Sequence, residues 1–337
     1  MKQLLIPHIG PPEVLRVTTG SDPMPTAGTV RIRVHAAGLN FSDLLARQGL
    51  YPDAPPLPAV VGYEVGGVID AVAPDVTAFR VGDRVMAMTR FGGQSSSVVV
   101  PQTLLFPLPQ GWSFAEGAAF PVVYLTAYHM LVRVAAAQRG ETLVVHAAAG
   151  GVGLAVAEIG RVLGLRVIGL ASAAKHGVLR EYGVEPLDGR DPHWDGAVRE
   201  LAPKGVDIVL DPLGGESLKR GYRLLAPVGR LITYGASGLS TGTRRNFVRV
   251  VWNVMHFPRF GPLSLMDRNV SVAGVNVGHL WNHAELLRPQ MEALVLLARD
   301  GKVRPRVGRE FAVEDAAAAH RYMHERRNIG KVVLTFA

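Results

Sequence analysis

The stretch VVHAAAGGVGLAVAEIGRVLGLRVIGLASAAKH, from Val144 to His176, decides the fold. A short apolar segment (142–147) passes through small residues into GVGLAVAEIGRVLG, in which apolar residues recur at helical spacing. A second apolar segment, LRVIGLA (165–171), follows this helix. Strand, tight turn, helix and strand in this order predict a βαβ unit of a parallel sheet.

The turn after the first strand has the pattern of a phosphate-binding loop. Ala148, Gly150 and Gly153 give A-x-G-x-x-G, close to the dinucleotide-binding motif G-x-G-x-x-G. Small residues let the backbone approach a pyrophosphate, and the N–H groups and positive dipole end of the helix bind its charge. A packing turn without a ligand is the alternative. We predict a dinucleotide cradle made of Ala149, Gly150, Gly151, Val152 and Gly153.

The end of the second strand indicates which dinucleotide is bound. NAD sites carry an acid there that bonds the ribose 2′-hydroxyl, whereas this chain has Ser172 followed by Lys175 and no carboxylate. A cation in a first helical turn opposes the helix dipole, which favours an anionic partner. Lys175 as a merely solvated residue is the alternative. The Ser-Lys pair therefore predicts NADPH as the cofactor.

The rest of the chain falls into two types of pattern. Residues 1 to about 118 are β-rich, with period-two alternation in TVRIRVHAAGL (29–39), and from about residue 120 strands alternate with helices. After about residue 262 come one more strand, two helices and a last strand, GKVVLTF (330–336). The class is α/β, with a parallel sheet and a β-rich part.

Composition excludes several kinds of function. There is no cysteine, which excludes disulfides, thiolate metal sites and a cysteine nucleophile. Net charge is +8, but the arginines are dispersed, so we attribute the charge to composition rather than to nucleic-acid binding. Neither a signal peptide nor a transmembrane helix is predicted, and we expect a soluble, cytoplasmic protein. One patch, Thr243 to Gly261, mixes Arg with large apolar residues; we interpret it as a packed helix or lid, with membrane contact as the lesser alternative.

Several motifs together resemble a known family. HAAAGGVGLAVAEIGR, GLNFSDLLARQGLYP, LTAYHML, SAAKHGVLREYGV, KGVDIVLDPLGG, GRLITYGAS and NIGKVVL resemble the zinc-independent quinone oxidoreductases of the medium-chain dehydrogenase/reductase superfamily, most of all the vesicle amine transport protein homologues. The resemblance implies a GroES-like catalytic domain (1–119 and 262–337) and an inserted Rossmann domain with a doubly wound parallel sheet (120–261). It also implies an active-site cleft between the domains and a homodimer joined through the Rossmann sheets.

The resemblance and the composition both predict a metal-free site. Tyr63 stands where zinc-dependent relatives carry His, and the His residues show no H-x-x-x-H cluster. Catalytic zinc needs three protein ligands, drawn from Cys, His and carboxylates. We therefore expect no bound metal, and Tyr63 becomes a candidate for a substrate contact.

Three further catalytic candidates lie in LNFSDLLARQGLY. Asn40 and Tyr51 can donate hydrogen bonds to a carbonyl or quinone oxygen that gains negative charge. The residues alone leave open whether Asn40 is only a helix N-cap and Tyr51 a packing residue; the resemblance favours a position near the nicotinamide for both. Asp43 is interpreted first as a favourable acid in the first helical turn, and second as a catalytic residue.

The remaining cofactor candidates come from strand ends and from the resemblance. Tyr234, Ala236 and Asn276 follow late strands of the parallel sheet, where ligands bind in such folds. By resemblance, Thr126 lies near the nicotinamide ribose, and Asn328 is a further contact. Relatives often carry Asp-Tyr-Arg where this chain has Asp188, Gly189 and Arg190, so an aromatic contact is lost while Arg190 remains a candidate for the 2′-phosphate.

These patterns predict an NADPH-dependent reductase that transfers hydride to a small-molecule quinone or to a C=C bond conjugated to a carbonyl, as in an alkenal. Two alternatives stay open. One is an enoyl-thioester reductase. The other is an NADPH-binding adaptor with little catalysis, associated with a membrane surface.

Overall fold

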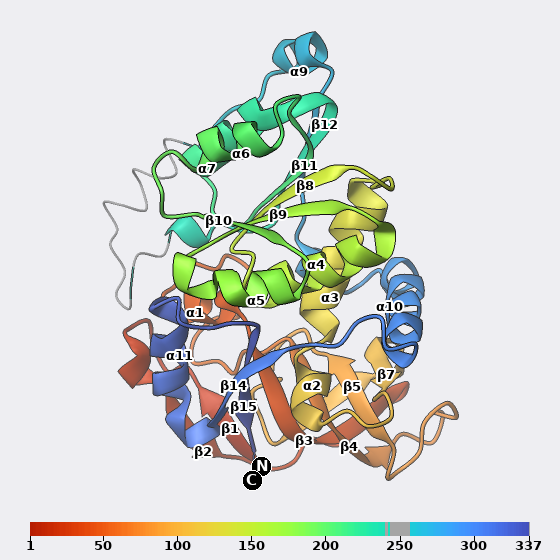
Figure 1. Cartoon of the computed structure of the whole chain (residues 1–337). Coiled ribbons are helices and arrows are strands. Elements are labelled where there is room, and N and C mark those ends of the chain that lie inside the picture. Colours follow the sequence, from red (N-terminus) through yellow and green to blue (C-terminus); the bar gives the residue numbers. More distant parts are fainter. Residues whose placement is uncertain (240–241, 243–256, 337) are drawn as a thin grey trace. The chain divides into compact units, whose positions relative to one another are not determined.

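The computed structural model describes residues 1–239, 242 and 257–336, and the patch predicted at Thr243 to Gly261 lies largely outside them. The described residues form two compact units, each taken by itself below (Figure 1). Unit 1 comprises residues 1–125, 242 and 278–336, and unit 2 comprises residues 126–239 and 257–277. Short 3₁₀ turns lie at Pro12–Val14, Gln102–Leu104, Ala173–Lys175, Ser237–Leu239, Val277–Leu280 and Val313–Asp315.

Unit 2 is built on a six-stranded sheet in the order β10-β9-β8-β11-β12-β13, with every pair parallel. The order reverses direction between β8 and β11, which is the topological switch point of a doubly wound fold. This confirms the predicted fold class. The strands are β8 (Thr142–His146), β9 (Arg166–Ala171), β10 (Glu185–Asp188), β11 (Val206–Asp211), β12 (Leu225–Thr233) and β13 (Ser271–Gly274).

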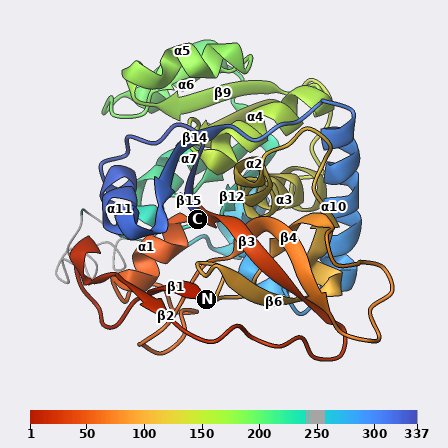
Figure 2. The ribbon, with the colours of Figure 1, turned by 90° about the horizontal axis from the view of Figure 1, so that it is seen from below.

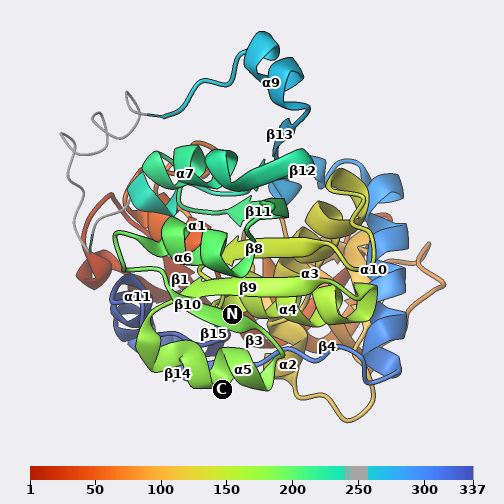
Figure 3. The same ribbon diagram turned by 45° about the horizontal axis from the view of Figure 1, so that its top comes forward.

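Helices cover both faces of this sheet (Figure 3). Helices α4 (Gly151–Leu163) and α5 (His176–Glu181) lie on one face, and α6 (Trp194–Leu201) and α7 (Glu216–Leu224) lie side by side on the other. The strands are apolar on both faces because both are buried, as Val144 and Val209 illustrate at 0% exposure.

The last strand of the sheet comes from the segment that the sequence groups with the β-rich domain. After helix α9 (Pro262–Arg268), β13 pairs with β12, and Val272 of β13 and the preceding Val270 pack against the apolar core of unit 2. Residues 262–277 therefore belong to the parallel sheet, and the chain returns to unit 1 at Gly278.

Unit 1 contains a seven-stranded sheet in the order β14-β15-β3-β4-β5-β7, with β6 paired to β3, and a separate β1-β2 pair. All pairs are antiparallel except β14 with β15. The strands are β1 (Lys2–Leu5), β2 (Arg16–Thr19), β3 (Thr29–Leu39), β4 (Glu64–Val72), β5 (Arg84–Met88), β6 (Ser97–Pro101), β7 (Leu105–Pro107), β14 (Val307–Ala312) and β15 (Lys331–Thr335).

The helices of unit 1 lie around this sheet. Figure 2 shows α11 and α10 at opposite sides of it: α11 contacts β14 and β15, and α10 contacts the turn before β7. Helix α3 carries the chain from unit 1 into unit 2 and ends in a π-helical turn (His129–Val134). The helices are α1 (Phe41–Arg47), α2 (Phe114–Ala118), α3 (Pro121–Tyr128), α10 (Ala284–Arg299) and α11 (Ala316–His324).

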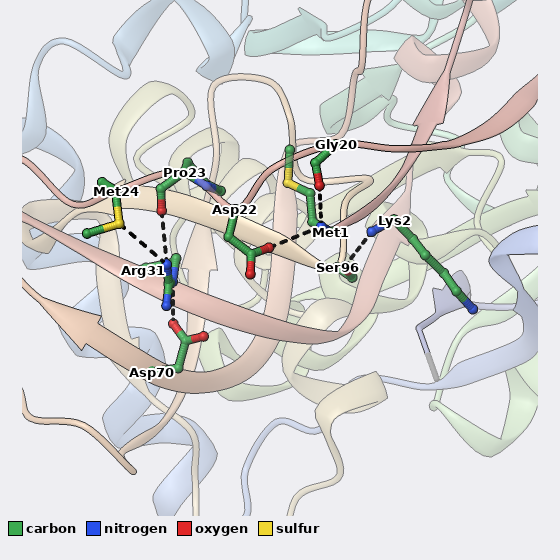
Figure 4. Close-up of polar contacts among 9 residues, drawn as sticks. All are labelled: Met1, Lys2, Gly20, Asp22, Pro23, Met24, Arg31, Asp70 and Ser96. Carbon is green, nitrogen blue, oxygen red and sulfur yellow. Dashed lines mark hydrogen bonds and ion pairs between the residues drawn. The ribbon is translucent and has the colours of Figure 1, made fainter.

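Polar contacts tie the N-terminus to the body of unit 1 (Figure 4). The Met1 amino group donates to the Gly20 carbonyl at 2.5 Å and pairs with Asp22 at 3.2 Å. Across the sheet, Arg31 Nε pairs with Asp70 Oδ1 at 2.8 Å. Such exposed or half-exposed ion pairs contribute little free energy each. The Met1 contacts join the start of the chain to the residues after β2, and the Arg31–Asp70 pair links β3 to β4.

Strand register in unit 1 brings three distant segments to one end of the sheet. Leu39, the last residue of β3, pairs with Val332 of β15, and Ala37 pairs with Val65 of β4. The residue after β3 is therefore a close neighbour of the first residues of β4 and β15. Those three positions carry polar side chains.

Candidate active site

The cofactor candidates of unit 2 lie along one edge of its sheet. Because every strand runs parallel, all carboxyl ends meet at the same edge. The predicted cradle follows β8, Ser172 follows β9, and Arg190 follows β10. Tyr234 and Ala236 follow β12, and Asn276 follows β13. The structure thus brings these predicted residues to one edge, and their roles stay predictions.

The turn between β8 and α4 has the shape of a phosphate cradle. Gly150 is the N-cap of α4, and the first hydrogen bond of that helix runs from the Leu154 N–H to the Gly150 carbonyl at 2.9 Å. The N–H groups before Leu154 have no acceptor within the helix. A Cβ on Gly153 would lie 2.3 Å from the Ala148 carbonyl oxygen, so the turn can close this tightly only with glycine there. The backbone fits a pyrophosphate.

The loops after β9 and β10 lie next to each other. The Gly189 N–H donates to the Ala171 carbonyl at 3.0 Å, which sets Arg190 close to Ser172. Asp188 Oδ1 accepts the Arg190 N–H at 2.9 Å. The sequence suggests that Lys175 lies in the first turn of α5. In the structure it is instead the last residue of the 3₁₀ turn that precedes this helix. That tighter turn keeps it near the end of β9.

Two buried polar residues at this edge were not predicted. His146 ends β8 and Asp211 ends β11, on either side of the switch point, with Nε2 and Oδ2 at 3.9 Å. Neither of these two atoms has a hydrogen-bond partner among the described residues. Burial lowers the pKa of His146, so the imidazole is neutral. A polar residue that ends an apolar strand is the signal that could have identified both.

The polar centre of unit 1 is Asn40. It occupies the N-cap position of α1, with extended backbone, and forms a capping box with Asp43. The Asn40 amide nitrogen donates to Glu64 Oε1 at 3.0 Å, and its carbonyl accepts from Lys331 Nζ at 2.6 Å. Lys331 also forms an ion pair with Glu64 Oε1. The amide therefore lies between a cation and an anion.

Glu64 and Lys331 are two site residues that were not predicted. Both are buried, at 0% and 4% exposure. Glu64 Oε2 accepts the Val122 N–H at 2.8 Å, which holds the carboxylate against the start of α3. A Cβ on Gly38 would lie 2.8 Å from Glu64 Oε1, so glycine in β3 makes room for this carboxylate. A charged residue that opens an apolar strand is the signal they share.

Asp43 is a buried carboxyl beside this group. Its Oδ2 accepts the Asn40 backbone N–H at 2.7 Å, which confirms a place in the first turn of α1. Its Oδ1 is buried without a hydrogen-bond partner. Burial raises the pKa of Asp43 to about 7, with Glu64 adding to the rise and the Asn40 N–H and Lys331 opposing it. Asp43 thus titrates near neutral pH, unlike an ordinary first-turn acid.

Tyr51 and Tyr63 lie next to each other, with ring centroids 6.2 Å apart and an edge-to-face geometry. Tyr63 is buried, and its hydroxyl meets no hydrogen-bond partner within the described part of the chain. Burial, then the charge of Asp43, raises the pKa of Tyr63, so the phenol keeps its proton. Tyr51 is half-buried and follows α1. The rings of Tyr51 and Tyr63 together form an apolar surface, and each ring carries one phenol hydroxyl.

The two remaining predicted residues lie away from these groups in the chain. Thr126 is half-buried in α3, and Asn328 lies in the loop before β15, where its amide contacts the Gly330 carbonyl at 3.5 Å. Among the residues that the structure describes, no three His, Asp or Glu side chains are arranged to hold a metal ion. No helix in the same residues is long and apolar enough to cross a bilayer.

Comparison with known proteins agrees with this architecture. Residues 26–110 match the alcohol dehydrogenase GroES-like domain, and residues 183–334 match the family of zinc-binding dehydrogenases. The synaptic vesicle membrane protein VAT-1 homolog of Danio rerio is 43% identical over 323 residues, which cover 95% of this chain and 66% of that protein.

Solved structures agree over the full length. A mycobacterial protein complexed with NADPH superposes with a TM-score of 0.87 at 30% identity, covering 100% of both chains. A quinone oxidoreductase from Pseudomonas syringae gives a TM-score of 0.86 at 29% identity, covering 99% of both chains. The chain belongs to the medium-chain dehydrogenase/reductase superfamily of oxidoreductases, among the relatives of the VAT-1 homologues.

Proposed function

We propose that the protein is an NADPH-dependent reductase that delivers hydride to a quinone or to a C=C bond conjugated to a carbonyl. The observation that carries this proposal is the edge of the unit 2 sheet, where a glycine-tight turn leads into α4 and the next strand, β9, is followed by Ser172 instead of an acid. The NADPH held by a mycobacterial relative of the same fold supports the choice of cofactor.

Named residues would hold the cofactor. The backbone of Gly150, Gly151 and Gly153 suits the pyrophosphate, and Ser172, Lys175 and Arg190 suit the 2′-phosphate. When bound, NADPH supplies the hydride. The loss of an aromatic side chain at Gly189 removes one stacking surface from the site, so we expect the phosphate contacts to carry most of the discrimination between NADPH and NADH.

Unit 1 supplies hydrogen-bond donors for the molecule that accepts the hydride. A quinone and an enone share one property: hydride addition places negative charge on a carbonyl oxygen. The Asn40 amide and the Tyr51 phenol are hydrogen-bond donors suited to that oxygen, and each such donor typically contributes about 100-fold or more to the rate. Tyr63 provides an apolar wall with a protonated hydroxyl, consistent with a contact to bound substrate.

The test is NADPH oxidation, followed by its absorbance, against a panel of quinones, 2-alkenals and crotonyl thioesters. We expect turnover with at least one class, and the preferred class separates a quinone or enone reductase from an enoyl-thioester reductase. Titration with NADPH that gave neither heat, nor a fluorescence change, nor a thermal shift would refute the proposal.

A nucleotide-binding adaptor is the second candidate, favoured by the name of the Danio rerio relative, a synaptic vesicle membrane protein homolog. This candidate requires tight NADPH binding and tight liposome binding without turnover.

The reductase proposal also includes a cytoplasmic location, which is compatible with a chain that has no cysteine. Its proposed partners are small-molecule substrates rather than nucleic acid.

We also propose a homodimer formed through unit 2. Strand β13 is the terminal strand of its sheet, and large apolar side chains near it are exposed: Val228 by 73%, Leu263 by 80% and Met266 by 70%. An exposed edge strand beside apolar surface favours pairing with another strand. Light scattering should give a dimer for the wild type and a monomer for the Leu263→Asp/Met266→Asp variant; a monomeric wild type would contradict the proposal.

A further inference from the structure

We propose that Lys331 is a positioning residue for the reaction, which fixes the orientation of the Asn40 amide through the buried network of Lys331, Asn40 and Glu64. The inference rests on the proposed function, in which Asn40 donates a hydrogen bond to the carbonyl oxygen of the acceptor. It assigns a role to a lysine almost 300 residues away from Asn40 in the sequence.

The contacts leave the amide one orientation. Lys331 Nζ donates to Asn40 Oδ1 at 2.6 Å, and Asn40 Nδ2 donates to Glu64 Oε1 at 3.0 Å. An amide turned by 180° would set its NH₂ group against the ammonium and its oxygen against the carboxylate, and both contacts would be repulsive. The pair of opposite charges therefore orients a neutral side chain.

This orientation leaves a donor for substrate. An asparagine amide has two N–H bonds, and Glu64 accepts one of them. Asn40 is half-buried, whereas Lys331 and Glu64 are buried. The second N–H is therefore the one that an acceptor molecule can reach. A donor that is already oriented needs no reorganisation when charge develops on the bound oxygen.

The network is held by elements from separate parts of unit 1. Asn40 precedes α1, Glu64 opens β4, and Lys331 opens β15. The Val122 N–H at the start of α3 holds the second oxygen of Glu64 at 2.8 Å. With its supports on strand and helix ends, the amide is fixed as a preorganised site requires.

The alternative is that Lys331 only neutralises Glu64 in the folded protein. That role would affect stability, whereas a positioning role would affect kcat through Asn40. A double-mutant cycle separates the two roles, because residues that act through one another are not additive.

The experiment compares Lys331→Met, Lys331→Arg and Lys331→Met/Glu64→Gln, each with Asn40 intact and with Asn40→Ala. Lys331→Met removes the charge, Lys331→Arg tests rescue, and the charge-neutral double variant covers the case in which Lys331→Met fails to fold. Steady-state kcat and KM are measured at saturating NADPH with the best acceptor of the panel. Lys2→Met is the control, since Lys2 is an exposed lysine of unit 1 paired with Glu314.

We expect Lys331→Met to lower kcat about tenfold with KM changed less than about twofold, a smaller loss than removal of an oxyanion donor itself. Lys331→Arg should restore most of kcat, and no Lys331 variant should lower kcat further once Asn40 is alanine. In ¹⁵N spectra without cofactor, the Asn40 side-chain amide signal should move in Lys331→Met and stay in place in Lys2→Met.

Two results would overturn the inference: an unchanged kcat in the Lys331 variants, or the same fractional loss with Asn40 intact and with Asn40→Ala. Both require a wild type that turns over, and they leave the proposed function standing. A wild type that reduces no member of the panel refutes the proposed function, and the positioning role with it.

Discussion

Replacement of Asp43 by Asn should stabilise the protein, and the gain should grow with pH. Asp43 is fully buried, and one of its two carboxyl oxygens has no hydrogen-bond partner. Asparagine has nearly the same shape and still presents an oxygen to the Asn40 N–H, but it carries no charge. The substitution therefore removes the free energy required to bury an ionised carboxyl and keeps the contact that begins α1.

The size of the effect follows from the pKa of Asp43, which rises from 3.8 to about 7 on folding. Between these values the folded state holds a proton that the unfolded state has lost. The contribution of Asp43 to stability is therefore fully present below pH 3.8 and is lost as the pH rises through 7. One pKa unit corresponds to about 1.4 kcal/mol, so the ionised carboxyl disfavours folding by about 4 kcal/mol above pH 7.

Urea unfolding of the wild type and Asp43→Asn at pH 5, 6, 7 and 8 measures this directly. The difference in the free energy of unfolding should widen by about 2 kcal/mol from pH 5 to pH 7 and level off above pH 8. Asp267→Asn is the control, because water solvates that exposed carboxylate in both states. A gap for Asp43→Asn that did not vary with pH would refute the reasoning.

Three other predictions test separate parts of the molecule. Lys175→Ala should weaken NADPH binding about 10- to 100-fold, the range expected for one charge-assisted hydrogen bond, and NADH binding far less; equal losses in calorimetry would contradict phosphate recognition. Gly153→Ala should lower both Tm and NADPH affinity, because its Cβ would lie 2.3 Å from the Ala148 oxygen, whereas Gly177→Ala, with nothing within 4 Å, should do neither. Burial and the charge of Arg47 lower the pKa of His324 from 6.5 to about 4, so the wild type should lose about 2 kcal/mol more than His324→Gln between pH 6.5 and pH 5 in urea unfolding; parallel curves would contradict this.

The parallel sheet could be predicted because its signal is local. Each strand is a short apolar run, and each glycine or helix that follows is adjacent in sequence. Helix α6 was not predicted because it buries only Trp194 and Val198, one turn apart, and begins two residues after Pro192. The 3₁₀ turn that carries Lys175 also left no trace in the sequence, since it differs from the start of α5 only in hydrogen-bond spacing.

The polar network of unit 1 could not be predicted from local patterns. Asn40 was identified as a candidate, but Glu64 and Lys331 reach it only through the pairing of β3 with β4 and with β15. A shift of either register by one residue would turn these side chains to the other face of the sheet. The network is therefore a property of the assembled sheet.

Asn40 also shows that two interpretations of a residue need not exclude each other. It stands at the N-cap of α1, as expected of an asparagine before a helix, and the Asp43 carboxylate accepts its backbone N–H. Its side-chain amide also contacts Glu64 and Lys331. Three ionisable groups buried around one neutral amide do not serve stability alone, because an apolar cluster of similar volume would often be as stable. Glu64 and Lys331 together orient the amide, and this is why we interpret the group as a site for chemistry rather than as a structural ion pair.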